Sequence, residues 1–256
     1  MNGETYQIAR IVSAAKKAMY ENTEFHFTPG PYEKSITFHF LPQKRLFIKQ
    51  ERVALSPDEW FAACRKDGLR DLFVLIRTDS SNPRLLGFIN TKPINMTVVY
   101  KNGDVHYWTP KWVFDGDHKQ WNVDYTEHIW DNPPHGLPTF IDNTNDFRNI
   151  LTEIKQFADL IGEGYFVTVF EKARNVLDGK EPAADAPDFP ELPAANRALF
   201  RAAMIADVFG AMGSWNDSPP CVANEKGLDD EYEGLSAELL KQIRLATMFA
   251  VNQWAQ

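Results

Sequence analysis

Acidic and histidine side chains concentrate between residues 115 and 135, where they could bind a metal ion. The stretch holds three of the six histidines and five carboxylates: Asp115, Asp117, His118, Asp124, Glu127, His128, Asp131 and His135. A metal site requires such ligands to converge within about 2.0–2.2 Å of the ion, usually through helical or turn spacing. The spacing here matches no HExxH motif, no HxH pair and no aspartate-rich calcium loop. The sequence therefore predicts no metal and no other cofactor.

The same stretch still defines an alternative function. If a metal were bound, its ligands would come from His118, His128, His135 and Asp117. The chain would then be a metal-assisted hydrolase that uses the acids and histidines of the segment Asp117–His135. We favour a structural role for these residues, because polar side chains are common at hairpin tips for reasons of turn conformation alone.

Motifs for covalent catalysis and for phosphate binding are absent from the sequence. It contains no Gly-x-Ser-x-Gly elbow. Gly162 and Gly164 join two predicted helices rather than a strand and a helix, so they cannot form a nucleotide-binding loop. Cys64 lies on the apolar stripe of a predicted helix, where cysteine behaves as a small hydrophobic residue. We therefore expect no catalytic residues and a non-enzymatic protein.

Contact residues for a ligand or partner are expected where a buried helix ends. Apolar residues recur at three- and four-residue steps from Leu199 onward, the spacing of one helix face. Gly210 and Gly213 then permit positive φ, so the chain can turn sharply. The exit of this helix carries three candidate contact residues: Trp215, Asn216 and Asp217. They form either a packed corner or a contact surface.

Four tryptophans lie within twenty-three residues: Trp108, Trp112, Trp121 and Trp130. Exposed and coplanar rings would form a stacking platform for sugars or a hot spot for a protein partner. We expect Trp112 and Trp121 to be buried, because they share the apolar face of a predicted hairpin. Trp130 lies in a predicted loop, and it is the fourth candidate contact residue.

Negative charge is unevenly distributed along the chain. The formal net charge is −8; residues 1–135 carry 17 basic and 16 acidic side chains, and residues 136–256 carry 10 and 19. An acidic half without a basic stripe repels phosphate groups, which argues against a nucleic-acid partner. The same charge attracts basic proteins. The sequence thus predicts a protein-interaction module whose partner is a basic protein.

Cysteine content and hydropathy predict a cytoplasmic protein. No run of about eighteen apolar residues is present, so we expect no membrane span. The first seventeen residues lack the basic and then apolar layout of a secretory signal. Two cysteines are too few for a disulfide framework, which indicates a reducing compartment.

Residues 1–138 predict a β-rich part with two helices. Apolar spacing predicts a helix over residues 4–20, and Ser56 with Glu59 predicts a capping box that begins a second helix. Alternating apolar residues predict strands at 36–40 and 45–50 that form a hairpin. The apolar run at 72–76 predicts a central strand, and residues 84–90 are predicted to form its neighbour.

Two further hairpins are predicted by their turns. Asn102 and Gly103 predict a two-residue type I′ loop, which pairs Val98 with Tyr107. A four-residue loop at 116–119 pairs Phe114 with Trp121 and keeps one face of the second hairpin apolar. This register places the histidine of the loop at an exposed tip.

Residues 139–256 predict four helices. Ser236 is the expected N-cap of the last helix. The segment Ser214–Gly234 is predicted to be a polar loop of about twenty residues, a length that is commonly functional.

Together these elements predict an α+β fold. An antiparallel sheet of six to eight strands with two helices forms residues 1–138, and the four-helix part, residues 139–256, packs on the sheet. Because the strands are aromatic on both faces, we expect one compact unit with a shared core. The contact surface is predicted near Trp215, at the junction of the sheet and the helices.

Overall fold

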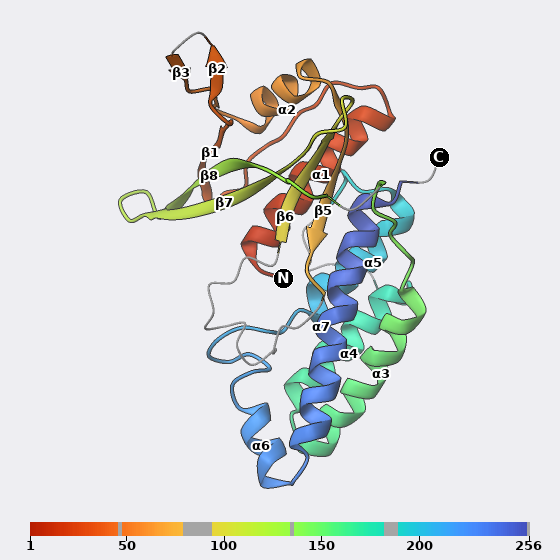
Figure 1. The fold of residues 1–256 in the computed structure, drawn as a ribbon. Helices are drawn as coiled ribbons and strands as arrows, with labels where there is room; N and C mark the ends of the chain where they lie inside the picture. Colours follow the sequence, from red (N-terminus) through yellow and green to blue (C-terminus); the bar gives the residue numbers. More distant parts are fainter. Residues whose placement is uncertain (46–47, 79–93, 134–135, 182–188, 255–256) are drawn as a thin grey trace. The chain divides into compact units, whose positions relative to one another are not determined.

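A six-stranded mixed sheet organises the first half of the chain (Figure 1). The computed structural model describes residues 1–45, 48–78, 94–133, 136–181 and 189–254. The strand order within this part is β4-β1-β8-β7-β6-β5. The strands are β1 (Glu33–His39), β4 (Val53–Ala54), β5 (Leu69–Ile76), β6 (Ile94–Tyr100), β7 (Val105–Asp115) and β8 (Gln120–Ile129). The predicted α+β class is therefore confirmed.

The prediction of an antiparallel sheet is wrong at β1. This strand pairs with β8 in parallel, with Ile36 opposite Val123 and Phe38 opposite Tyr125. The hairpin expected between 36–40 and 45–50 does not form, because β2 (Gln43–Arg45) and β3 (Ile48–Gln50) pair with each other instead. Alternating apolar residues define which face a strand buries, but they do not define its neighbour.

The two predicted hairpins differ in outcome. In the β7–β8 hairpin, Phe114 lies opposite Trp121 as predicted. In the β6–β7 hairpin, Val98 lies opposite His106 rather than Tyr107, so the predicted register is wrong by one residue. The loop contains three residues and ends at Gly103 with φ +94°, which is a type I turn followed by a glycine bulge.

Both predicted helices of the first half are present. Helix α1 (Gly3–Tyr20) and helix α2 (Pro57–Lys66) match the expected segments, and the Ser56 side chain caps α2 by accepting a hydrogen bond from the Glu59 amide. The Trp60 ring of α2 stacks on Phe38 with ring centroids 4.9 Å apart. Phe38 in turn stacks on Tyr125 at 4.8 Å, which binds β1 and β8 to the helix layer.

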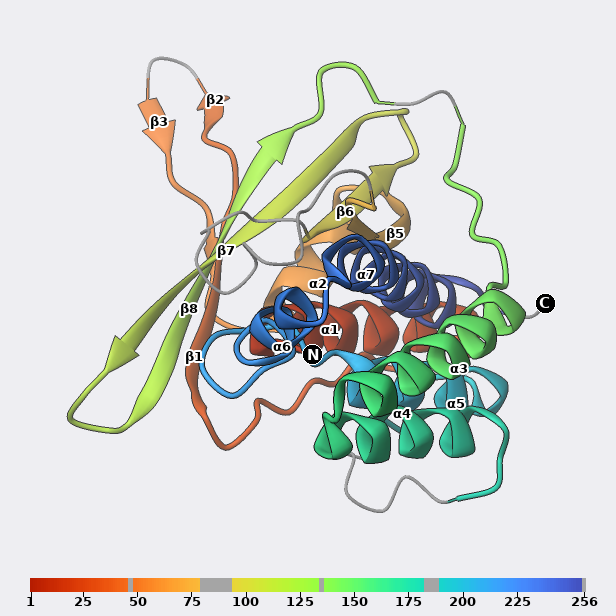
Figure 2. The same ribbon diagram turned by 90° about the horizontal axis from the view of Figure 1, so that it is seen from below.

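Five helices, not four, follow residue 138 in the described part of the chain. They are α3 (Thr144–Ile161), α4 (Gly164–Leu177), α5 (Ala194–Ala206), α6 (Pro219–Glu225) and α7 (Asp229–Asn252). Helix α3 contacts α4 and α7, and α5 contacts the same two helices, so the four longest form a closed bundle (Figures 1 and 2).

Three boundaries in this region differ from the prediction. Helix α6 lies inside the expected loop Ser214–Gly234, where Pro219 occupies the first helical turn. Helix α7 begins at Asp229, so Ser236 lies within it and caps nothing. Helix α5 ends at Ala206, before both glycines that were expected to end it.

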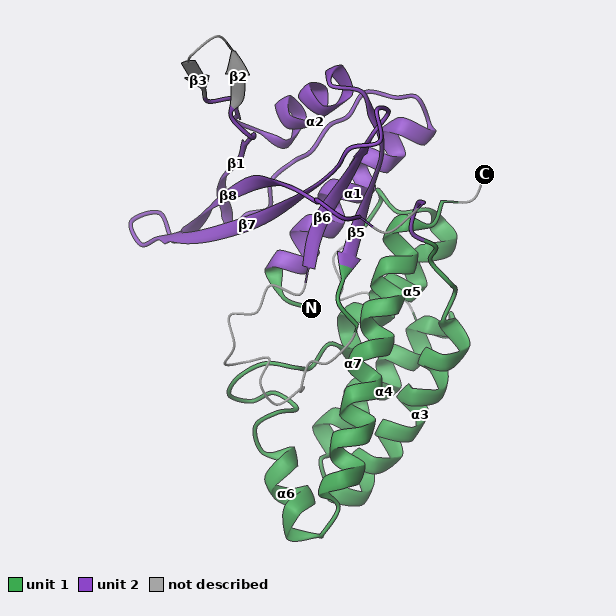
Figure 3. Ribbon diagram, viewed as in Figure 1, with its two compact units in different colours: residues 1–3, 76–93, 139–256 green, residues 4–75, 94–138 purple. Residues whose placement is uncertain are grey.

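The chain divides into two compact units (Figure 3). Unit 2, Glu4–Leu75 and Ile94–Pro138, contains the sheet with α1 and α2. Unit 1, Met1–Gly3, Ile76–Pro93 and Thr139–Gln256, contains the helix bundle. The shared core expected from the sequence stays a prediction. The strand expected at 84–90 and the candidate ligand His135 lie outside the described residues.

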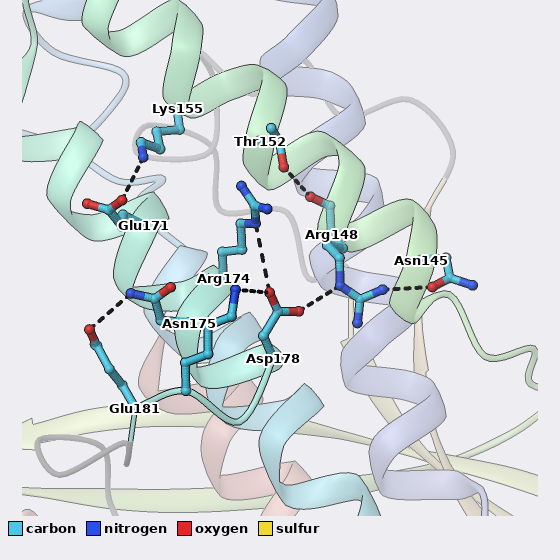
Figure 4. Close-up of polar contacts among 10 residues, drawn as sticks. Asn145, Arg148, Thr152, Lys155, Glu171, Arg174, Asn175, Asp178 and Glu181 are labelled. Atoms are coloured by element: carbon cyan, nitrogen blue, oxygen red, sulfur yellow. Dashed lines mark hydrogen bonds and ion pairs between the residues drawn. The ribbon is translucent and has the colours of Figure 1, made fainter.

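Surface charges in unit 1 are paired across neighbouring helices (Figure 4). Asp178, which follows α4, accepts a hydrogen bond from Arg148 Nε of α3 at 2.7 Å. Lys155 of α3 donates to Glu171 of α4 at 2.7 Å. The hydrogen bond from Arg148 holds the pKa of the Asp178 carboxyl below its usual value. These hydrogen bonds connect α3 to α4, and the Asp178 and Glu171 carboxylates both accept from a cation.

Candidate functional site

Trp215, the first predicted contact residue, is completely buried in unit 1. Its Nε1 donates a hydrogen bond to Ser236 Oγ at 2.8 Å, and Tyr232 stacks on its ring with centroids 5.6 Å apart. The Tyr232 hydroxyl donates to the Trp215 carbonyl at 2.7 Å. Phe166 of α4 meets the indole edge-on at 5.0 Å. The Trp215 indole is therefore held in one orientation inside unit 1.

The neighbouring polar residues close the turn that leads into Trp215. Asp217 Oδ2 accepts a hydrogen bond from the Gly213 amide at 2.7 Å, and Gly213 has φ +79°. Asn216 Nδ2 donates to the Gly210 carbonyl at 3.4 Å. The predicted sharp turn therefore uses positive φ at Gly213, and it lies after α5 has already ended at Ala206.

A groove of about 690 Å³ lies beside this turn, and we call it the α4 groove. Its walls are the first turns of α4 and the segment between Asp207 and Ser214. Two apolar side chains in the walls are strongly exposed: Met212 at 93% and Tyr165 at 71%. Phe166, which packs against Trp215, forms part of the floor. Sequence reasoning missed both exposed residues as contact residues: Met212 fitted the apolar spacing of the helix that begins near Leu199, and Tyr165 belonged to no pattern that was singled out.

Trp130, the fourth predicted contact residue, is half-buried in unit 2. It lines two hollows, one of about 470 Å³ and one of about 130 Å³. Tyr107 lies edge-on to its ring at 6.3 Å and lines the larger hollow. Trp130 thus borders two hollows, and its role as a contact residue stays a prediction.

The candidate metal ligands do not converge in the described residues. His118 lies at the exposed hairpin tip with Nδ1 2.9 Å from Asp115 Oδ2. His128 bonds Thr109 Oγ1 through Nε2 at 2.9 Å. Ten positions separate the two histidines, eight of them along β8, which corresponds to about 30 Å. Asp117 is exposed in the loop, and no group of three or more metal-binding side chains occurs in the part of the chain that is described.

Asp115 at the same tip is part of a charge pair rather than a ligand set. Lys34 Nζ of β1 donates to its Oδ2 at 2.6 Å. This hydrogen bond, supported by the His118 amide and imidazole, holds the pKa of the Asp115 carboxyl well below its usual range. The cluster stabilises the turn geometry of the hairpin.

One acid–histidine pair was missed by sequence reasoning. Glu127 Oε1 lies 2.7 Å from His106 Nδ1, and the Glu127 side chain is only 5% exposed. Both residues line a cleft of about 250 Å³ in unit 2. The β7–β8 register contained the signal, since it places Trp108 opposite Glu127 and His106 two positions further on the same face.

Comparisons with protein-family models, with curated proteins and with solved structures found no match. No helix in the described ranges is long and apolar enough to cross a lipid bilayer. Both cysteines, Cys64 and Cys221, carry free thiols.

Proposed function

We propose that the chain is a protein-interaction module and that the α4 groove binds an apolar, basic segment of a partner protein. The observation that carries this proposal is the pair of exposed side chains, Met212 and Tyr165, in the walls of one groove. Apolar side chains gathered in a concave surface are typical of interaction sites. Tyrosine is also enriched among the residues that contribute most to binding.

The support beneath the groove favours binding without rearrangement. Trp215 is held by hydrogen bonds on both its indole and its carbonyl, and Phe166 packs on it at 5.0 Å. A surface that is ordered before binding loses less conformational entropy when a partner arrives. The α4 groove is therefore suited to a peptide segment that inserts one or two apolar side chains.

Charge around the groove specifies the partner further, since the lining itself contains one basic residue, Lys172, and one acidic residue, Asp207. Residues 136–256, which contain the whole groove, carry 10 basic and 19 acidic side chains. An excess of negative charge raises the association rate of positively charged proteins. We therefore propose a segment in which lysine or arginine flanks the inserted apolar residues.

A selection from a random peptide library tests this proposal. Dodecamer peptides displayed on phage are selected against the full chain, and the best binder is synthesised and titrated by calorimetry. The expected sequences combine Lys or Arg with Leu, Phe or Met. Met212→Lys should weaken binding at least tenfold, because about 1.5–3 kcal/mol of apolar burial is lost and like charges then meet.

Leu160→Lys is the matched control. Leu160 lies on α3, is 57% exposed and does not line the groove. The Leu160→Lys substitution should leave the dissociation constant of the selected peptide unchanged. Equal affinity of the Met212→Lys and Leu160→Lys variants would contradict the proposal, and so would a selection that enriches acidic peptides.

We also propose that this function is exercised in the cytoplasm. The support is the pair of free thiols, since free cysteines persist in reducing compartments. Fractionation of cells that express the tagged chain tests the location, and recovery outside the cytoplasmic fraction would contradict it.

A further inference from the structure

We propose that His106 is a general base, oriented by Glu127, in a cleft of unit 2 that takes a small neutral or cationic ester or amide. This inference goes beyond the proposed interaction function, because it involves neither the α4 groove nor a protein partner. It rests on the hydrogen bonds of a buried carboxylate, on the free edge of an imidazole and on the charges of one cleft.

Glu127 fixes the orientation and the tautomer of His106. Glu127 Oε2 accepts a hydrogen bond from the Leu41 amide at 2.8 Å, and Oε1 accepts from His106 Nδ1 at 2.7 Å. An ionised carboxylate can only accept, so the proton of the neutral imidazole lies on Nδ1. The lone pair is then on Nε2, as in histidines that act as general bases.

Nε2 of His106 is available to a ligand. No protein group in the described residues is hydrogen-bonded to this atom, and the His106 side chain is 19% exposed. His106 lines the cleft of about 250 Å³ together with Glu127, Tyr100 and Arg52. A cleft of this size accommodates a small substrate or a water molecule beside one.

The neighbouring thiol and phenol are not the reacting groups. Tyr100 packs edge-on to the His106 ring at 5.1 Å and donates its hydroxyl to Cys64 Sγ at 3.8 Å. Burial raises the pKa of both Cys64 and Tyr100, so both stay protonated near neutral pH. A neutral, fully buried thiol is a poor nucleophile, which leaves water as the nucleophile that His106 activates.

The charges of the cleft define the substrate class. Arg52 Nη1 donates a hydrogen bond to Asp67 Oδ2 at 2.5 Å, and both residues line the cleft. Asp104 and Glu127 are two further acidic residues of the lining, so three acidic residues and one arginine line the cleft. This balance attracts a neutral or cationic substrate and disfavours an anionic one.

The reaction is hydrolysis with one proton carried by the imidazole. His106 Nε2 takes a proton from water as the water oxygen bonds to the carbonyl carbon, and the carbonyl oxygen becomes an oxyanion. Collapse of this tetrahedral intermediate breaks the bond to the alcohol or amine, which receives the proton from Nε2–H. Arg52 lines the same cleft and is the cation that can stabilise the oxyanion.

His118 provides a matched control inside the same chain. It also pairs with a carboxylate through Nδ1, at 2.9 Å from Asp115. Its side chain is 58% exposed and lies at a hairpin tip outside the described cleft. Both histidines therefore pair with a carboxylate, but only His106 lines the cleft.

Three activated esters test the proposal: p-nitrophenyl acetate, which is neutral, glycine p-nitrophenyl ester, which is cationic, and mono-p-nitrophenyl succinate, which is anionic. His106→Gln should lower kcat/KM for the neutral and cationic esters about 100-fold, the lower end of general-base contributions. His118→Gln should leave it unchanged. The anionic ester should be the slowest substrate of the unmodified chain.

Glu127 is a positioning residue, and its test needs a readout beyond rate. Nitrogen-15 NMR of His106 should show the Nδ1–H tautomer in the unmodified chain and a mixture in Glu127→Gln, with kcat reduced about tenfold. The measurement on the unmodified chain stands even if a variant does not fold. An Nε2–H tautomer, ester hydrolysis no faster than buffer, or equal losses in His106→Gln and His118→Gln would overturn the proposal.

Discussion

The two units of the chain differ in the groups whose pKa the fold raises. Unit 2 buries weak acids, and burial raises the pKa of Cys64, Tyr100 and Tyr125. Unit 1 keeps carboxylates at its surface beside cations, which lowers the pKa of Glu171 and Asp178 (Figure 4). The sheet unit thus holds a protonated thiol and two protonated phenols in its interior and a lysine-paired Asp115 at its hairpin tip, whereas Glu171 and Asp178 of the helix unit are paired with cations across two helices.

This difference separates two kinds of site. A polar group in the sheet unit is oriented by buried partners, as His106 is by Glu127, and such fixed orientation suits chemistry. In the helix unit, Arg148 pairs with Asp178 and Lys155 pairs with Glu171 between α3 and α4. The α4 groove presents apolar side chains over an aromatic floor. Such a surface suits docking.

The largest expected effect concerns the core beneath the groove. Trp215→Ala should lower the free energy of unfolding by about 3–5 kcal/mol, because a fully buried aromatic ring is removed and a cavity remains. Trp121→Ala is the control: the sequence predicted a buried ring, but Trp121 is 37% exposed, so its loss should be smaller, about 1–2 kcal/mol. Denaturant titration measures both. A Trp215 loss no larger than the Trp121 loss would contradict a packed corner.

The next effect is alkaline destabilisation of the sheet unit. Burial raises the folded-state pKa of Cys64 above its ordinary value of 9.0. The protonated thiol therefore makes its full contribution to the free energy of unfolding below pH 9, and this contribution is lost above pH 9, where the thiol of the unfolded chain ionises. The loss approaches about 1.4 kcal/mol per pH unit for one group. The unfolding free energy of Cys64→Ala should therefore fall less steeply between pH 9 and 10. Parallel curves would argue against a protonated, buried thiol.

A smaller effect in acid is expected for the helix unit. Asp178→Asn removes the carboxylate that accepts from Arg148 and should cost about 1 kcal/mol at pH 7. The folded-state pKa of Asp178 is lowered, so this contribution is present above its ordinary value of 3.8 and is lost as pH falls through the folded value. The free energies of unfolding of the unmodified chain and of Asp178→Asn, measured as a function of pH, should converge in strong acid. A constant difference down to pH 2 would exclude the ion pair as its source.

The smallest effect is expected at the hairpin tip. His118→Asn should change the unfolding free energy by less than about 0.5 kcal/mol, because the side chain is 58% exposed and its pair is solvated. Thermal unfolding measures this change, and a loss above 1 kcal/mol would give the tip a larger structural role than its exposure implies.

Local patterns predicted the elements better than their partners. The N-cap role of Ser56 and the β7–β8 register follow from neighbouring residues, and both are confirmed. The second half of the predicted capping box differs, because Glu59 Oε2 accepts from the Leu55 amide rather than from that of Ser56. The parallel pairing of β1 with β8 joins residues that are more than eighty positions apart, and no local pattern encodes it. Helix α6 was missed because polar residues and prolines dominate its sequence, although proline is well suited to a first turn.

The one-residue error at the β6–β7 turn explains why His106 was missed. A two-residue loop puts Tyr107 on the face of Val98, whereas the observed three-residue loop puts His106 there. The register predicted correctly for β7–β8 already placed even-numbered residues of β7, including Trp108, on the face of Glu127. Consistency between the two hairpins would have favoured the longer loop and revealed the pair.

The α4 groove escaped prediction for a different reason. Trp215 was identified as unusual, but an indole at a chain turn is compatible with burial and with contact alike. The structure buries it and exposes Met212 instead, which depends on where α5 ends. Helix ends are set by tertiary packing as well as by glycine, so the exposed side chain could not be identified from spacing.

Methyl NMR of the methionines during titration with a selected peptide tests the proposed function most directly. Met212 lines the α4 groove at 93% exposure, and Met96 of β6 is completely buried in unit 2. We predict that the Met212 methyl resonance shifts to saturation with the same dissociation constant as calorimetry, while Met96 stays unchanged. Saturating binding that leaves Met212 unmoved would contradict the account.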